Sequence, residues 1–113
     1  MAARHLRRGG YRIVARNLRM RVGEIDLVAE DPRDAGLIVV VEVKSGESDS
    51  MPPELHVNAA KRRKLVALAR RLLRRRRLAG RRVRFDVVAV VWPGSEKKPT
   101  RITHYTGAFA SAR

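Results

Sequence analysis

Residues 36–46, "GLIVVVEVKSG", decide the fold of this chain. Their uninterrupted run of leucine, isoleucine and valine predicts a strand that is buried on both faces. Glu42 and Lys44 then stand on either side of Val43. Because successive side chains of a strand point to opposite faces, the two charges share one face while Val41 and Val43 point into the core. The pair is either an ion pair that ends the strand or a set of groups that do chemistry.

A helix and another apolar strand follow this stretch. Residues 54–78 carry apolar side chains at spacings of three and four, which predicts one amphipathic helix that ends before Gly80. Residues 82–92, "RVRFDVVAVVW", are apolar on nearly both faces and predict an interior strand. A strand, a long helix and a strand form a βαβ unit, so the two strands are expected to be parallel with a right-handed crossover. The apolar stripe of the helix consists of Leu65, Leu68, Ala69, Leu72 and Leu73.

The chain starts with a predicted short helix and a predicted strand. Residues 2–8 favour a helix that Gly9 and Gly10 stop, and residues 11–20 favour a strand. The tail, residues 100–113, favours a short strand or helix. On the first strand, the residues expected to share one face are Tyr11, Ile13 and Ala15.

A second strand is predicted for residues 23–30, "GEIDLVAE", by its period of two. Its short connection to residues 36–46 implies an antiparallel hairpin. The whole chain is therefore expected to be one α/β domain over residues 1–113, with a mixed sheet of about four or five strands and the long helix across one face. Of the second strand, one face is expected to carry Ile25, Leu27 and Ala29, and the other Glu24, Asp26 and Val28.

Length and composition exclude several classes of protein. A chain of 113 residues is long enough for a single modest core. It contains no cysteine, which excludes disulfides and thiolate zinc sites. No run approaches the roughly 20 apolar residues of a membrane span. The basic start, "MAARHLRRGGYR", lacks the apolar segment of a secretory signal, so a cytoplasmic location is expected.

The charge is strongly basic and unevenly distributed. Lysine and arginine number 26 against 11 acids, a formal net charge of +15. Residues 1–23 hold seven basic side chains and residues 55–84 hold thirteen, both without an acid, whereas nine acids fall between Glu24 and Glu54. Nucleic acid is therefore the expected partner, rather than a membrane surface, because the basic helix has no aromatic anchor. The helix residues expected to contact phosphates are Lys61, Arg62, Arg70 and Arg74.

The acids of the second and third strands are expected to converge. If Asp26 lies opposite Glu42 in the hairpin, then Glu24 lies opposite Lys44, and all four groups share a face. Two carboxylates about 4 to 5 Å apart do not both ionise without a positive partner, and a divalent cation would resolve that repulsion. Mg²⁺ prefers oxygen ligands and keeps several waters, so two carboxylates and one backbone carbonyl would suffice. The alternative is an ordinary salt-bridge patch at a sheet edge.

Four segments carry a resemblance to a known family. The stretches "GYRIVARNLRMRVGEIDLVAED", "VVVEVKS", "AAKRRKLVALARRLL" and "RRVRFDVVAVV" resemble the YraN family, small bacterial proteins grouped with endonuclease-like folds. The resemblance covers about residues 2–92. It implies a three-layer, restriction-endonuclease-like core of the PD-(D/E)XK superfamily, similar to archaeal Holliday-junction resolvases.

The resemblance also assigns roles to residues. It makes Asp26 and Glu42 the two metal acids and Lys44 the lysine of the E-x-K motif, with the Val43 carbonyl completing the shell around Mg²⁺ or Mn²⁺. Glu24 is a further metal candidate from its predicted position. Family members usually carry a helix with a Gly-Glu pair before the stretch that matches "AARHL". In related nucleases an acid from that helix often assists the metal.

A second difference concerns phosphate binding. Family members commonly read V-E-V-K-x-R, whereas "SGES" follows Lys44 here, so Lys61 or Arg62 would have to take the place of that arginine.

Two functions of the protein remain open. The first is a metal-dependent endonuclease that hydrolyses phosphodiesters in structured or branched nucleic acid, DNA in preference to RNA, as a homodimer like its junction-cutting relatives. The other is a non-catalytic basic binding module with the same fold.

Among the other polar residues, Asp86 and the three histidines are not expected to act in catalysis. Asp86 faces the same way as Arg84 on the predicted fourth strand and is expected to form a structural pair with it. His5, His56 and His104 are scattered singly in the sequence, so solvated or capping roles are expected for them.

Overall fold

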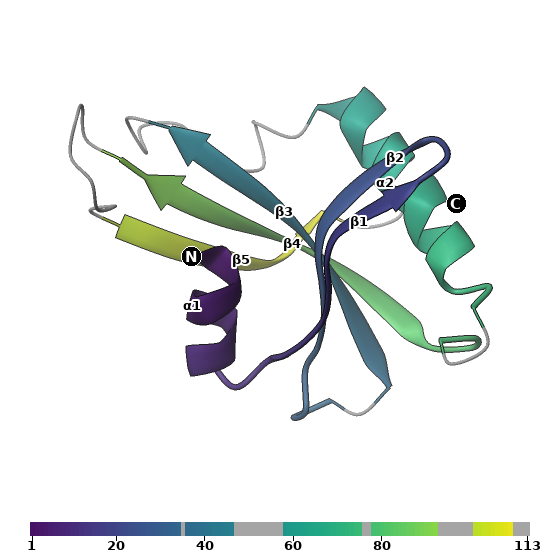
Figure 1. Cartoon of the computed structure of the whole chain (residues 1–113), viewed down its shortest axis with the longest axis horizontal. Coiled ribbons are helices and arrows are strands. Elements are labelled where there is room, and N and C mark those ends of the chain that lie inside the picture. The colour runs from purple at the N-terminus through teal and green to yellow at the C-terminus, as the bar shows by residue number, and fades with distance from the viewer. Residues whose placement is uncertain (35, 47–57, 76–77, 93–100, 110–113) are drawn as a thin grey trace.

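The computed structural model describes residues 1–34, 36–46, 58–75, 78–92 and 101–109. These residues form an α/β fold with two helices and one five-stranded sheet of strand order β1-β2-β3-β4-β5 (Figure 1). The predicted fold class is confirmed. In chain order the elements are α1 (Ala2–Arg8), β1 (Arg12–Met20), β2 (Gly23–Glu30), β3 (Leu37–Gly46), α2 (Ala59–Leu72), β4 (Arg82–Val91) and β5 (Arg101–Phe109).

The sheet is mixed as the hydrophobic patterns predicted. The strands β2 and β3 pair antiparallel, and β3 pairs with β4 in parallel from Leu37↔Arg82 to Gly46↔Val91. All of the run from Leu37 to Val41 is buried, because both faces of β3 are covered. The tail forms β5, which pairs antiparallel with β4, so β4 is an interior strand as expected.

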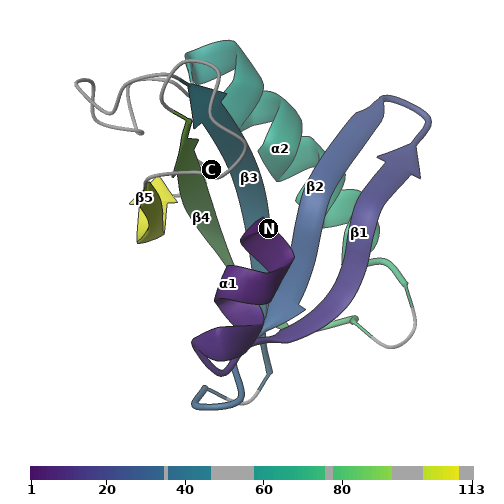
Figure 2. The same ribbon diagram turned by 60° about the vertical axis from the view of Figure 1, so that its left-hand side comes forward.

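The two helices cover opposite faces of the sheet, which gives three layers. Figure 2 shows α1 in front of the sheet and α2 behind it. Leu6 of α1 packs with Val39 and Val41 of β3, while Leu65 of α2 packs with Ile38 on the other face. This arrangement is compatible with a restriction-endonuclease-like core. No helix in the described part of the chain is long and apolar enough to cross a membrane.

Helix α2 is shorter than its pattern predicted. It begins at Ala59, because the Asn58 side chain caps it, and it ends at Leu72 instead of near Leu78. Four arginines follow in sequence from residue 74, and like charges at helical spacing destabilise a further turn. The predicted start at residues 54–57 lies outside the described residues. The expected stripe is buried at Leu65, Leu68, Ala69 and Leu72, and Leu73 packs against it.

Irregularities in β1 and β2 change the faces of two residues, Ala15 and Ile25. The register of the pair shifts between Ile13 and Ala15, so Ile13 packs on the α1 side but Ala15 on the α2 side. The expectation that Tyr11, Ile13 and Ala15 share a face is therefore wrong for Ala15. Ile25 packs with Val28 on the α2 side, so its predicted grouping with Leu27 is also wrong.

The second irregularity lies at Asn17 and Asp26. Asn17 has a φ of 46°, a left-handed conformation that asparagine tolerates better than most residues. It lies between the pairs Arg16↔Leu27 and Leu18↔Ile25, directly across from Asp26. Beyond this point the β1–β2 hairpin leaves β3 and runs beside α2 (Figure 1). The strict alternation assumed from the sequence fails at the bend.

Candidate functional site

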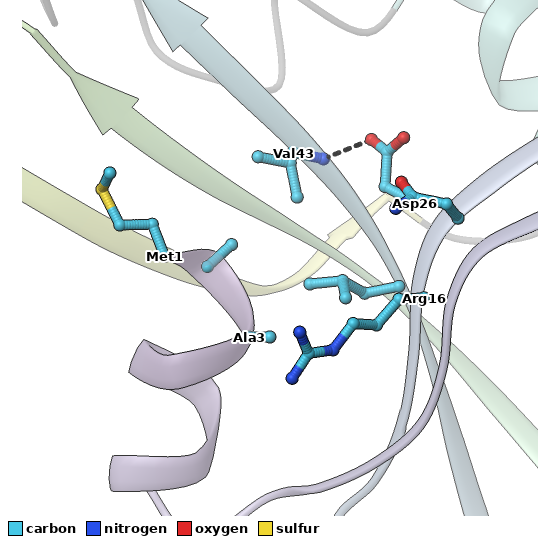
Figure 3. Close-up of a pocket in the computed structure, with 8 residues that line it drawn as sticks. Met1, Ala3, Arg16, Asp26 and Val43 are labelled. Carbon is cyan, nitrogen blue, oxygen red and sulfur yellow. Dashed lines mark hydrogen bonds between the residues drawn. The ribbon is translucent and has the colours of Figure 1, made fainter.

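The candidate site lies where β2 and β3 part. At Leu27↔Val41 their pairing has the register that would place Asp26 opposite Glu42, but it ends there, one residue before that pair would form. The Asp26 side chain lies in the opening instead, where its Oδ2 atom accepts a hydrogen bond of 2.8 Å from the Val43 backbone N–H (Figure 3). This contact holds the Asp26 carboxylate beside the middle residue of the Glu-Val-Lys triplet.

Glu42 is nearly buried and faces two lysines. Only 5% of the residue is exposed. Its Oε1 atom lies 3.0 Å from Nζ of Lys61 and 3.8 Å from Nζ of Lys44. Neither lysine is buried, since their side chains are 44% and 29% exposed. The carboxylate is therefore held by two flexible, partly solvated ammonium groups, of which Lys61 is the nearer.

Lys61 reaches Glu42 from the first turn of α2. The Asn58 side chain accepts a hydrogen bond of 2.9 Å from the Lys61 backbone N–H, as an N-cap residue does. The cap fixes where the helix begins, and thereby fixes Lys61 above the end of the apolar run of β3. The sequence placed Lys61 among the phosphate contacts and gave no reason to pair it with Glu42. The missed signal is the asparagine three residues before it, which marks a helix start.

Asp26 borders a cavity on each side of the sheet. The cavity toward α1 has a volume of about 320 Å³, and Figure 3 shows Arg16 extending into it beside Ala3. The cavity toward α2 has a volume of about 190 Å³. It is lined by Glu24, Asp26, Lys61, Lys64, Leu65 and Leu68.

Gly23 allows the hairpin to approach α2 this closely. A Cβ atom at this position would lie 2.7 Å from Cε of Lys64 and 3.3 Å from a methyl group of Leu68. The absence of a side chain thus brings Glu24 and Lys64 to the walls of one cavity. Gly23 therefore serves a close approach between the hairpin and α2.

The structure brings together most, but not all, of the predicted site. Asp26, Glu42, Val43 and Lys44 are neighbours. Glu24 is exposed and shares a cavity with Asp26, but the predicted pairing of Glu24 with Lys44 does not form, because β2 has left β3 before that point. The expectation of four groups in one regular ladder is wrong in that respect.

The donor set fits a small divalent cation in its chemistry. The carboxylates of Asp26 and Glu42 flank Val43, and oxygen is the ligand atom that Mg²⁺ prefers. An ammonium group already lies 3.0 Å from Glu42, so the position attracts positive charge. Within the described residues, no group of three or more His, Cys, Asp or Glu side chains could hold a metal ion. A bound Mg²⁺ would therefore retain several of its waters.

The four basic residues predicted to contact phosphates divide into two groups. Lys61 contacts Glu42, and the guanidinium of Arg62 lies 5.6 Å from the ring centre of Phe109. Arg70 and Arg74 are exposed, and neither forms an ion pair with any residue that the structure describes. Of the four predicted phosphate contacts, Arg70 and Arg74 are thus the two whose charge remains available to a partner.

The acids at the opposite end of the sheet are engaged by arginines. The pKa of each carboxyl group lies below its usual value, chiefly because an arginine side chain donates a hydrogen bond to it. The pairs are Glu30 with Arg12, Asp31 with Arg33 and Asp34 with Arg82. Arginine there neutralises acid, so the uncompensated positive charge of the chain lies elsewhere.

A second buried carboxylate, Asp86, has a structural role. Arg84 donates two hydrogen bonds of 2.8 Å to it, which confirms the predicted pair, and the Gly107 backbone donates another of 2.9 Å. His104 lies 2.6 Å from Oδ2 of Asp86 through its Nε2 atom. The prediction that His104 has a solvated or capping role is therefore wrong. Burial by itself raises the pKa of Asp86, but the hydrogen bonds outweigh it and lower the pKa.

Comparison with known proteins identifies similar sequences along most of the chain. The family model described as "Uncharacterised protein family UPF0102" matches residues 1–90. A UPF0102 protein of Rhodopirellula baltica is 46% identical over 110 residues, which cover 96% of this chain and 65% of that protein. This chain thus spans slightly less than two thirds of that relative.

Two further relatives are matched over more of their own length. A UPF0102 protein of Persephonella marina is 44% identical over 91 residues, 80% of this chain and 76% of that protein. One of Syntrophotalea carbinolica is 42% identical over 111 residues, 96% of this chain and 85% of that protein. The matched residues include both strands of the candidate site, since the family model extends to residue 90.

Proposed function

This chain belongs to the UPF0102 (YraN) family, and from that membership and the site geometry we propose that it is a metal-dependent nuclease acting on structured or branched nucleic acid. The observation that carries the proposal is the hydrogen bond from the Val43 N–H to Asp26. It ties an acid of β2 to the Glu-Val-Lys triplet of β3 after the two strands have ceased to pair. A purely structural ladder does not need an acid at that position.

In the proposed site, Asp26 and Glu42 would hold Mg²⁺ or Mn²⁺, with the Val43 carbonyl and solvent as further ligands. Once bound, the cation would supply Lewis-acid polarisation of the scissile phosphodiester. Lys44 is partly exposed beside Glu42, and its ammonium group would donate a hydrogen bond to a phosphoryl oxygen and stabilise the charge that develops there. Glu24, on the wall of the neighbouring cavity, would assist through solvent.

The basic surface of α2 supports a nucleic-acid substrate. Arg70 and Arg74 are exposed on or directly after the helix whose first turn borders the site. Contacts from such residues go to phosphates and position the substrate without reading its sequence. DNA is the proposed substrate in preference to RNA. A homodimer would place two sites on opposite strands of a branched substrate.

The direct test is cleavage of branched DNA, single-stranded DNA and RNA in Mg²⁺ or Mn²⁺. Asp26→Ala and Glu42→Ala are each expected to reduce the rate by about 100-fold or more, because each removes charge stabilisation at the reacting phosphate. The matched control is Glu30→Ala, which removes an acid of the same strand that pairs with Arg12. Cleavage that survives both site substitutions would refute the assignment of these residues.

A non-catalytic binding module is the second candidate, and one observation favours it. Lys61 and Lys44 already neutralise Glu42, so the acids can coexist without a cation. A module of this kind would bind nucleic acid with an affinity that falls steeply with salt and would cleave nothing under any metal condition. Absence of cleavage together with such binding would select this candidate.

The basic surface itself is tested by salt dependence. Replacing Arg70 and Arg74 by alanine is expected to weaken DNA binding and to lower the salt slope by about one unit for each phosphate contact that is lost. Arg12→Ala removes a charge that is paired with Glu30, so it serves as the control and should change the slope little. If Arg12→Ala lowered the salt slope as much as the loss of one exposed arginine does, DNA binding would depend only on the total charge of the protein.

A further inference from the structure

The contact between Lys61 and Glu42 has a consequence for how the proposed site is loaded. Glu42 is almost completely removed from solvent, and a carboxylate in that position requires a positive partner. The nearer of its two partners comes from α2, a different element, and its ammonium group is 44% exposed. Lys61 thus bridges the interior carboxylate and the solvent-facing surface of the basic helix.

The charges around the cavity between Asp26 and α2 are balanced without a metal. Glu24 and Asp26 line it together with Lys61 and Lys64, and Lys44 lies near the same oxygen atom of Glu42 as Lys61 does. Three acids therefore face three lysines. A divalent cation added between Asp26 and Glu42 would leave an excess of positive charge, and its position would be close to the ammonium group of Lys61. Like charges so close in a partly buried site repel strongly.

We propose that Lys61 is a displaceable counterion of Glu42, which moves to the phosphate backbone of bound nucleic acid when a divalent cation takes its place. This inference rests on the proposed function of the site. Lysine is suited to the exchange because its flexible stem carries a compact charge, whereas arginine would form a fixed fork with the carboxylate. A phosphate of the bound nucleic acid then pairs with the Lys61 ammonium group that the cation has displaced from Glu42.

Cation and nucleic acid should then bind cooperatively. Either one releases Lys61 from Glu42 and so removes part of the cost of binding the other. Linkage requires that nucleic acid tighten the cation by the same factor by which the cation tightens nucleic acid. Without its ammonium group at position 61, the protein should bind the cation more tightly in the absence of nucleic acid and lose this coupling.

The test measures the affinity for Mn²⁺ by isothermal titration calorimetry, with and without a four-way DNA junction that carries phosphorothioate linkages to slow cleavage. Lys61→Met is expected to tighten Mn²⁺ binding to the DNA-free protein by about fivefold or more, the lower end of typical couplings. Lys64→Met is the matched control, since it removes the same charge from the same cavity and helix. Lys64 itself makes no ion pair with a described residue. Lys61→Arg keeps the charge but would form a fixed fork with Glu42, so it should bind Mn²⁺ less tightly than the unmodified protein does.

Each outcome decides the inference. A Mn²⁺ affinity that rises in Lys61→Met beyond the rise in Lys64→Met, together with a loss of coupling to the junction, supports it. It also gains support if only Lys61→Met binds Mn²⁺. If the unmodified protein binds Mn²⁺ and Lys61→Met binds it no better than Lys64→Met does, the inference fails and the proposed nuclease function stands. If no variant binds Mn²⁺, the inference and the metal-dependent function fail together.

Discussion

Asp86 and Glu42 are both nearly inaccessible carboxylates on neighbouring parallel strands, yet their partners differ in kind. Asp86, with no exposed surface, receives two hydrogen bonds from the Arg84 fork, one from the Gly107 backbone and a contact from His104. Glu42, 5% exposed, faces two lysine ammonium groups at one oxygen atom. The Asp86 carboxylate is thus held by several groups at both oxygen atoms, whereas the Glu42 carboxylate is held at one oxygen atom.

The difference distinguishes the firmly held Asp86 from the acid of the proposed site. The Arg84 fork donates two hydrogen bonds at once and the Gly107 backbone N–H adds a third from β5, whereas a lysine on a flexible stem can rotate into solvent. The Asp86 cluster also joins β4 to β5 and, through a bond of 2.7 Å from Arg84 to the Tyr11 hydroxyl, to the chain after α1. Burial of a carboxylate alone therefore does not identify a candidate site, and the kind of partner that holds it separates Asp86 from Glu42.

The largest expected effect is on stability, in Asp86→Asn. The amide nitrogen would face N–H donors that now point at a carboxylate oxygen, and the Arg84 charge would lose its buried partner. Breaking a buried ion pair from one side costs about 3 to 5 kcal/mol. Urea unfolding measures the loss.

The control for this prediction is Asp34→Asn, which alters an exposed pair with Arg82. It should move the unfolding midpoint little. A stability loss in Asp86→Asn as small as that of the control would contradict the structural role of the cluster and remove the contrast with Glu42.

A smaller effect is expected from acid. Hydrogen bonds from His104, Arg84 and Gly107 outweigh burial and hold the pKa of Asp86 below its usual value, so the folded state binds this proton less readily than the unfolded state. The resulting stabilisation is present above the ordinary carboxyl range and is lost as the pH falls through the folded-state pKa. The urea midpoint should therefore drop below about pH 4, and Asp86→Asn should show a smaller drop. Equal drops would assign the acid sensitivity to Glu30, Asp31 and Asp34, whose pKa values are also lowered.

Much of this contrast was accessible from the sequence. The apolar run of β3, the antiparallel pairing of β2 with β3 and the Arg84–Asp86 pair follow from patterns of residues close together in the chain. The register of that pairing does not, because a shift by two residues leaves the same side chains on each face. The contact of Lys61 with Glu42 depends on where α2 begins, and the prediction that it begins near residue 54 hid that contact. The end of the β2–β3 pairing depends on a bend at Asn17, and a strand period carries no information about bends.

A moderate effect is expected from substitution of Asn17, the residue that bends β1 across from Asp26. Its positive φ of 46° is accessible to glycine at no steric cost and costs a β-branched side chain about 1 to 2 kcal/mol. Asn17→Gly should therefore unfold at nearly the same urea concentration as the unmodified protein, and Asn17→Val should be less stable by that amount. Should Asn17→Val be as stable as Asn17→Gly, the bend would not depend on this residue, and another cause for the separation of β2 from β3 would be required.

The smallest effect on stability is expected where the effect on function is largest, in Glu42→Gln. The amide oxygen can still accept a hydrogen bond from Lys61, and both lysines are partly exposed, so the loss should stay within about 1 kcal/mol. Cleavage and Mn²⁺ binding should nevertheless be lost, because the amide carries no charge to hold a cation. Urea unfolding and calorimetry on one preparation give both numbers. A destabilisation close to that of Asp86→Asn would place Glu42 among the structural acids, because a carboxylate that the fold requires cannot be one whose counterion is free to leave.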